Sequence, residues 1–187
     1  MTTETTARDD RRARILDAAQ ELFLRYGVKR TSVDDVARLT GIAKGTVYLS
    51  FASKDELFIA LAERMSSEAL ARACALAAGS APVAERITDV LDTLIGEFAR
   101  LLEQSPHAAE LIDTKRGSAA PVFAAYYGGI DALLAELLAG EGITAADAPQ
   151  LFRAAAHGAL DVGDKDAIAY RARLKRLVET LLAGLRP

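Results

Sequence analysis

The chain has 187 residues, of which 51% are hydrophobic and 26% are charged. This composition is typical of a globular protein with enough length for a core and for two domains. A single cysteine excludes an internal disulfide framework. No stretch approaches the ~18 uninterrupted apolar residues of a membrane-spanning helix, and the polar N-terminus lacks the apolar segment of a secretion signal. The sequence therefore predicts a soluble, cytoplasmic protein with no membrane contact.

The charge is unevenly distributed around a net value of -3. Residues 1–54 carry ten Lys or Arg and seven Asp or Glu, whereas residues 55–187 carry thirteen and nineteen. The N-terminal part is thus basic and the rest of the chain is acidic, which favours contact of the N-terminal part with a polyanion. The excess of positive charge in residues 1–54 is small. Charge alone therefore does not distinguish a polyanion-binding segment from a chance distribution of charged residues.

Apolar residues recur at helical spacing along the chain, and no alternating strand pattern is present. After a disordered arm over residues 1–8, we expect helices over 9–26, 32–41, 44–50 and 53–78. Further helices are expected over 82–104, 106–114, 118–139, 147–160 and 164–185, with most breaks at Gly or Pro. The predicted fold class is all-α.

Local signals mark where the first helices begin and end. Ser32 can cap a helix through its hydroxyl, and Asp35 lies where a carboxylate favours a helix N-terminus. Gly41 can adopt the positive φ of a tight turn. Residues 53–56 form a capping box that opens a long helix. At ~1.5 Å per residue this helix is roughly 30 Å long or more, so it must link the N-terminal part to the remainder.

Residues 32–51 read SVDDVARLTGIAKGTVYLSF, which is the pattern of a helix-turn-helix. Their spacing turns Ile42, Val47 and Phe51 toward a small core with apolar residues of the preceding helices. An outward tyrosine and leucine on so short a second helix indicate that a partner covers them. The side chains expected to point outward are Lys44, Gly45, Thr46, Tyr48 and Leu49.

Over about residues 11–60 the sequence resembles the tetracycline-repressor (TetR) family. The resemblance is carried by AAQELFLRYG, TSVDDVARLTGIAKGTVY and FASKDELF, whose combined order and spacing are specific. It implies a three-helix helix-turn-helix DNA-binding domain over residues 1–53 and a helical ligand-binding and dimerisation domain over 54–187. It also implies a homodimeric repressor that binds a near-palindromic, double-stranded operator DNA. A small, mostly apolar effector molecule would release it.

By position, the resemblance assigns DNA contacts to the helix-turn-helix and to the start of the long helix. Expected at phosphate are Thr31, Ser32, Tyr48 and Lys54, and expected at base edges and backbone are Lys44, Gly45 and Thr46. Leu49 could pack on a thymine methyl group. Ala43 replaces the Ser or Thr that is common in the family, so the recognition helix lacks a side-chain cap. The arginines at the start of the first helix are either solvated or in contact with DNA; they are Arg8, Arg11, Arg12 and Arg14.

In the second domain, one set of residues either lines a ligand pocket or forms plain core: Leu61, Met65, Leu94, Phe98, Phe123, Tyr126 and Tyr127. Gly128 and Gly129 follow the two tyrosines and are expected to kink or open their helix. The last two helices carry an apolar stripe that is wide enough for both core and partner. The resemblance favours a four-helix dimer interface there, although the sequence alone permits a purely internal core. The interface residues would be Leu151, Ala155, Leu174, Val178, Leu181 and Leu182.

Catalytic and metal-binding signals are missing from the sequence. We find no phosphate loop, dinucleotide fingerprint, zinc motif or nucleophile elbow, so we predict neither enzymatic activity nor a cofactor. His107 and His157 lack partners at ligand spacing, which predicts no metal site. Cys74 is expected to be a small buried residue. The alternative function is a TetR-like nucleoid-organising or division-control protein that binds DNA without a small-molecule ligand.

Overall fold

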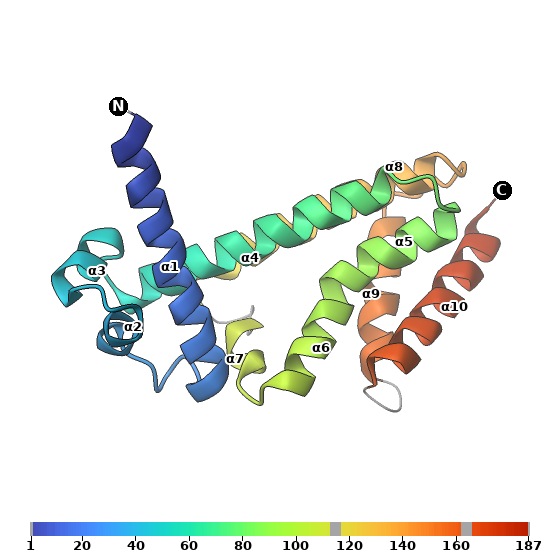
Figure 1. Cartoon of the computed structure of the whole chain (residues 1–187). Coiled ribbons are helices and arrows are strands. Elements are labelled where there is room, and N and C mark those ends of the chain that lie inside the picture. Colours follow the sequence, from blue (N-terminus) through green and yellow to red (C-terminus); the bar gives the residue numbers. More distant parts are fainter. Residues whose placement is uncertain (1, 113–116, 162–165, 187) are drawn as a thin grey trace. The chain divides into compact units, whose positions relative to one another are not determined.

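A computed structural model of the chain describes residues 2–112, 117–161 and 166–186. Within these ranges every regular element is a helix, which confirms the all-α fold class (Figure 1). The first four are α1 (Thr2–Tyr26), α2 (Val33–Thr40), α3 (Lys44–Ser50) and α4 (Lys54–Ala77). They are followed by α5 (Val83–Leu91), η1 (Asp92–Gly96), α6 (Glu97–Gln104), α7 (Ala108–Ile112), α8 (Ala120–Ala139), α9 (Ala148–Asp161) and α10 (Ala167–Leu185).

Two expectations about these elements are wrong. The arm expected over residues 1–8 is helical from Thr2 onward, because no Gly or Pro precedes Asp9 to stop α1. The helix expected over 82–104 contains a π-helical turn, η1. A β-carbon at Gly96 would lie 1.8 Å from Oδ1 of Asp92, so this turn requires glycine.

The chain forms two compact units, which we describe separately. Unit 1 comprises Met1–Met65 and Gln104–Phe123, and unit 2 comprises Ser66–Glu103 and Ala124–Pro187. Unit 1 therefore contains the helix-turn-helix segment together with the first half of α4 and with α7.

Unit 1 has a hydrophobic core of its own, built where α1, α2, α3 and the start of α4 meet. The side chains of Phe23, Val36, Val47 and Phe51 are fully buried there, and Ile42 packs against them. Complete burial of such a side chain stabilises the fold by about 1.5–3 kcal/mol. The core thus has the composition that the helix-turn-helix pattern predicts.

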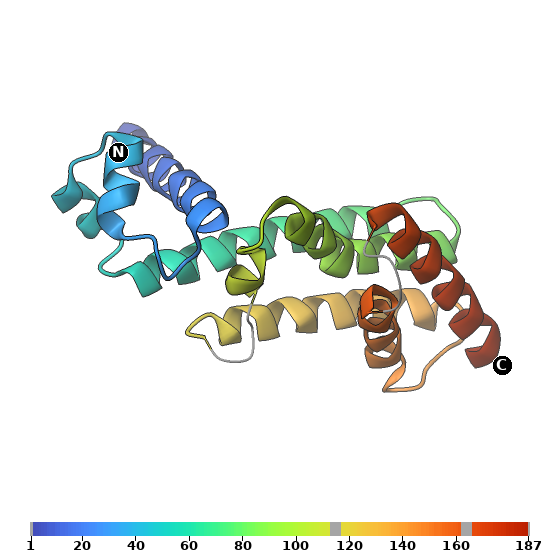
Figure 2. The same ribbon diagram turned by 90° about the horizontal axis from the view of Figure 1, so that it is seen from below.

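The core of unit 2 is formed by α5, η1, α9, α10 and parts of α4 and α8. Helices α9 and α10 pack against each other, as both views show (Figures 1 and 2). The expected kink at Gly128 and Gly129 is wrong, because α8 runs through both residues without interruption. Gly129 instead permits close approach to α4, since a β-carbon there would lie 2.9 Å from Cδ2 of Leu70. Cys74 is exposed, contrary to the expectation that it is buried.

Among the described helices, α8 has the length and composition of a candidate membrane span, with a mean hydropathy of 1.4. Asp131 and Glu136 interrupt its apolar run. The core helix of a soluble protein meets the same criterion, so length and composition alone do not place α8 in a membrane.

Candidate nucleic-acid interface

The first helix of the helix-turn-helix begins with a complete capping box. The backbone N–H of Asp35 donates to the Ser32 hydroxyl at 3.2 Å, and the N–H of Ser32 donates to the Asp35 carboxylate at 2.9 Å. The Ser32 hydroxyl also donates to that carboxylate at 2.6 Å. This hydroxyl, and then the backbone N–H, hold the pKa of Asp35 below its ordinary value. The cap predicted at Ser32 is confirmed.

The turn between α2 and α3 depends on glycine. Gly41 has a φ of +68°, in the left-handed region that favours glycine. Thr40 closes the end of α2 by donating its hydroxyl to the carbonyl oxygen of Val36 at 2.9 Å. The next helix starts without a side-chain cap at Ala43, as expected from the sequence. The predicted helix-turn-helix geometry is therefore present.

The outer face of α3 exposes side chains that its own fold does not cover. Leu49 is 86% exposed and Tyr48 is 42% exposed, whereas Val47 of the same helix is fully buried. Lys44 lies at the start of the same face, and its ammonium is 2.7 Å from the Asp34 carboxylate. A hydrogen bond from Lys44 to Asp34, reinforced by their opposite charges, raises the pKa of Lys44. Gly45 is exposed and Thr46 is half-buried.

The predicted phosphate contact of the Thr31 hydroxyl is wrong. Thr31 is only 3% exposed, and its hydroxyl donates to the carbonyl oxygens of Gly27 at 2.9 Å and Leu22 at 3.3 Å. The hydroxyl closes the end of α1 and faces away from solvent. Ser32, next in the chain, is exposed and stays a candidate for phosphate.

Lys54, at the start of α4, forms hydrogen bonds with the turn that follows α1. Its ammonium donates to the carbonyl oxygen of Val28 at 3.1 Å and to that of Lys29 at 3.5 Å. A phosphate contact by Lys54 stays a prediction. In the structure this side chain also stabilises the turn that follows α1. The sequence offered no signal for it, because the partners lie 25 and 26 residues away.

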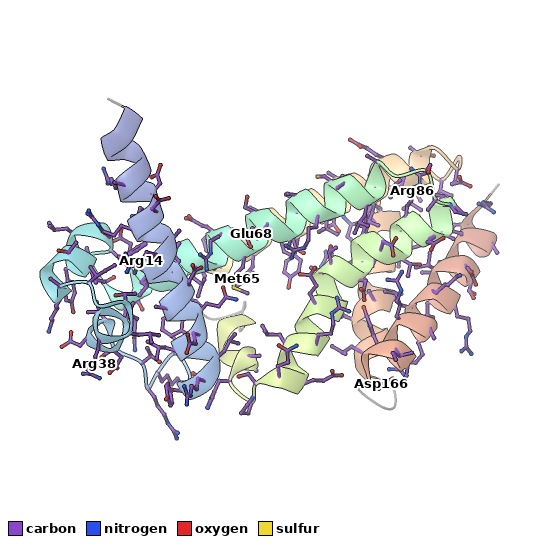
Figure 3. The ribbon with its side chains drawn as sticks, viewed as in Figure 1. Arg14, Arg38, Met65, Glu68, Arg86 and Asp166 are labelled. Carbon is purple, nitrogen blue, oxygen red and sulfur yellow. The ribbon has the colours of Figure 1, made fainter. Side chains whose placement is uncertain are left out.

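Two arginines of α1 close the ends of the helix-turn-helix helices. Arg12 donates to the carbonyl oxygen of Ser50 at 2.6 Å, and its guanidinium carbon lies 4.2 Å from the centre of the Phe51 ring. Arg14, which is labelled in Figure 3, donates to the carbonyl oxygen of Thr40 at 3.1 Å. Cations at these positions satisfy carbonyls that the ends of α2 and α3 leave unpaired. Arg12 and Arg14 are therefore not purely solvated, and a DNA contact by either residue stays a prediction.

Comparison with known proteins agrees with this geometry. The family model described as "Bacterial regulatory proteins, tetR family" matches residues 15–61. The regulator YhgD of Bacillus subtilis (strain 168) is 47% identical over 49 residues, which are 26% of each chain. A solved TetR/AcrR-family regulator from Thermobifida fusca is 29% identical, with a TM-score of 0.63 over 95% of this chain and 100% of its own. Residues 15–61 therefore match the DNA-binding segment of the TetR family.

Further similar proteins match a short part of the sequence or share the fold at low sequence identity. The chain covers only 26–31% of the length of four curated relatives that it matches. Bacillus subtilis FadR, solved in complex with stearoyl-CoA, is 20% identical with a TM-score of 0.64 over 93% of this chain and 97% of its own. At this identity the likeness shows a shared fold.

The predicted ligand-lining residues are divided between the two units. Leu61, Met65 and Phe123 belong to unit 1, and Leu61 is buried in the core of that unit. Leu94, Tyr126 and Tyr127 belong to unit 2, whereas the side chain of Phe98 lies outside the described ones. The Tyr126 hydroxyl donates to the carbonyl oxygen of Thr93 within the π-helical turn at 3.3 Å, and burial raises the pKa of Tyr126 to about 12. The ligand assignment stays a prediction.

The predicted dimer interface needs correction at three of its six residues. Leu174, Val178 and Leu182 are buried in the core of unit 2, because α10 turns this stripe toward α5 and α9. They cannot contact a partner directly. Leu151 is exposed, and Ala155 and Leu181 are partly exposed. A surface groove of about 460 Å³ runs between α9 and α10, lined by Ala155, Gly158, Ala159, Arg173, Arg176 and Leu177.

Proposed function

We propose that this chain is a cytoplasmic transcriptional regulator of the TetR family, acting as a repressor, that binds double-stranded operator DNA through α3. One observation carries the proposal. Leu49 and Tyr48 are exposed on a short helix, and Val47 of the same helix is buried in the core of unit 1. A major groove admits such a helix, and a leucine there can contact thymine methyl groups. Lys44 and the exposed N-terminus of α2 at Ser32 supply groups for phosphate.

A single helix-turn-helix reads only a few base pairs, so the proposal includes a homodimer. Its interface would lie on the outer faces of α9 and α10, where Leu151 and Leu177 are exposed next to the groove that includes Ala155 and Gly158. Small residues allow helices of two chains to approach closely, and the leucines supply apolar area. Two copies related by a twofold axis would match a near-palindromic operator.

The proposed release signal is a small, mostly apolar molecule bound in the helical second domain. Support comes from the core of unit 2, which is largely aliphatic and carries the Tyr126 hydroxyl beside a π-helical turn. It also comes from the FadR neighbour, whose structure contains stearoyl-CoA. A nucleoid-organising protein without a ligand is the less favoured alternative, and a genome-wide count of bound sites separates the two. A catalytic activity is not part of the proposal.

The test is DNA binding by a matched pair of leucine variants. Leu49→Ala should weaken binding of the purified full chain to its operator by about 1 kcal/mol or more, as the loss of a base contact would. Leu76→Ala removes a leucine of α4 that is 38% exposed and lies outside the helix-turn-helix, and it should leave binding unchanged. Equal affinity of Leu49→Ala and the wild type would contradict the placement of α3 in the groove.

A further inference from the structure

The turn between α1 and α2 is held from two sides by polar groups. Gly27 ends α1 with a φ of +87°, and its N–H donates to the carbonyl oxygen of Phe23 at 2.9 Å. The Lys54 ammonium binds the carbonyl oxygens of Val28 and Lys29. These contacts engage the carbonyl oxygens of the turn, and the N–H groups of Val28 and Lys29 are not part of them.

The carboxylate of Glu110, on α7, lies at these N–H groups. The N–H of Lys29 donates to its Oε2 at 3.4 Å, and the N–H of Val28 also favours the ionised carboxylate. Burial disfavours the ionised carboxylate, but these two amides and the His107 imidazole outweigh burial and hold the pKa of Glu110 below its ordinary value. The carboxylate therefore occupies a small backbone anion site, of the kind that successive N–H groups form in a turn.

Neighbouring groups fit this carboxylate closely. A β-carbon at Gly27 would lie 2.8 Å from Oε1 of Glu110 and 3.1 Å from Nδ1 of His107, so glycine makes room for both. Nδ1 of His107 lies 3.2 Å from Oε1 of Glu110. Ser105, just before α7, donates its hydroxyl to the carbonyl oxygen of Leu24 in the last turn of α1.

We propose that Glu110 is a positioning residue for DNA binding, which holds the turn at Val28 and Lys29 and thereby sets the N-terminus of α2. The turn leads directly into Thr31, whose buried hydroxyl is bonded to Gly27, and then into Ser32, the cap of α2. A displaced turn would carry Ser32 away from phosphate without removing any group that touches DNA. This inference rests on the proposed function for its effect on DNA, but the contact itself can be tested without DNA.

The contact is tested by the amide resonances of the full-length wild-type protein. On acidification, protonation of Glu110 should shift the amide proton signal of Lys29, with a midpoint below the ordinary glutamate pKa of about 4.5. In Glu110→Gln this pH-dependent shift should vanish, while it should persist in Glu103→Gln, which alters an exposed glutamate of α6. A Lys29 amide that does not titrate in the wild type would overturn the contact.

The role in DNA binding is tested with the same variants. Glu110→Gln should weaken operator binding about tenfold, which corresponds to about 1.4 kcal/mol, at every salt concentration. The slope of log affinity against log salt should stay that of the wild type, because no phosphate contact is lost. Glu103→Gln should bind like the wild type.

The outcomes separate the two claims. If the wild type binds no duplex DNA, the proposed function fails and the positioning role fails with it, while the amide titration still decides the contact. If the wild type binds DNA and Glu110→Gln, verified as folded by its thermal transition, binds equally well, the positioning role alone is wrong. A reduced salt slope in Glu110→Gln would also contradict it, since that result marks a phosphate contact.

Discussion

The guanidinium of Arg12 donates a 2.6 Å hydrogen bond to the carbonyl oxygen of Ser50 and lies over the ring of Phe51. One side chain of α1 thus closes the end of α3 and covers the aromatic residue that anchors this helix in the core. Arg14 makes the equivalent contact to the end of α2. The candidate recognition helix therefore depends on α1 for its position as well as on its own sequence.

Replacing Arg12 should loosen α3. Arg12→Ala removes a charge-assisted hydrogen bond and a cation–π contact, and should lower the free energy of unfolding by about 1–2 kcal/mol. Arg11→Ala, at an exposed neighbouring position, is the control and should unfold like the wild type. Urea titration of both variants measures the difference. Equal stabilities would show that the Arg12 contacts contribute nothing to unit 1.

Neutralising Asp34 should strengthen DNA binding. Its carboxylate holds the Lys44 ammonium at 2.7 Å and lies next to the candidate DNA surface, where it would repel phosphate. Asp34→Asn should raise the affinity for duplex DNA about threefold to tenfold and steepen the salt slope by about one unit. Glu63→Gln, at an exposed position of α4, should change neither quantity. Weaker binding by Asp34→Asn would mean that the ion pair orients Lys44 for its contact.

The parts of this fold that depend on neighbouring residues could be predicted from the sequence. The cap at Ser32, the left-handed Gly41 and the buried Val47 follow from spacing and residue type within one turn or two. Contacts between distant segments could not be predicted. Lys54 is 26 residues from Val28, and Glu110 is 81 residues from Lys29, so no local pattern indicated either contact.

The apolar residues of α10 that were assigned to the dimer interface show a second limit of prediction from the sequence. An apolar repeat predicts that a helix buries one face, but it does not say whether the same chain or another chain covers that face. The structure shows that the same chain covers Leu174 and Val178. The π-helical turn was missed for a related reason, because its requirement for Gly96 arises only from the position of the Asp92 carboxylate.

The cap of α2 should make stability depend on pH. The pKa of Asp35 is lowered from 3.8 in the folded chain, chiefly by the Ser32 hydroxyl. Its contribution to stability is therefore present above the unfolded pKa and is lost as pH falls through the lower, folded value. Ser32→Ala should lower the melting temperature at pH 7. The difference in melting temperature from the wild type should narrow as the pH falls below 3.8, through the lowered pKa of Asp35. A gap that stays constant from pH 7 to pH 2.5 would contradict this coupling.

Charging the outer face of α10 should separate the proposed dimer. Leu177 is 37% exposed and lines the groove between α9 and α10, so Leu177→Glu would bury a charge only if a partner covers it. We expect a folded monomer with little operator affinity. Lys175→Glu changes an exposed position on another side of α10 and should remain dimeric. Light scattering gives the mass of each variant, and a dimeric Leu177→Glu would place the interface elsewhere.

The central claim is that this chain recognises DNA sequence through paired copies of α3. Selection of bound duplexes from a random-sequence pool by the purified full-length protein tests it most directly. We predict enrichment of one near-palindrome whose half-sites are about one helical turn apart, ~34–36 Å, and loss of that enrichment with Leu49→Ala. A pool that shows no enriched sequence after selection, or that enriches the same sequence with Leu49→Ala, would contradict the account.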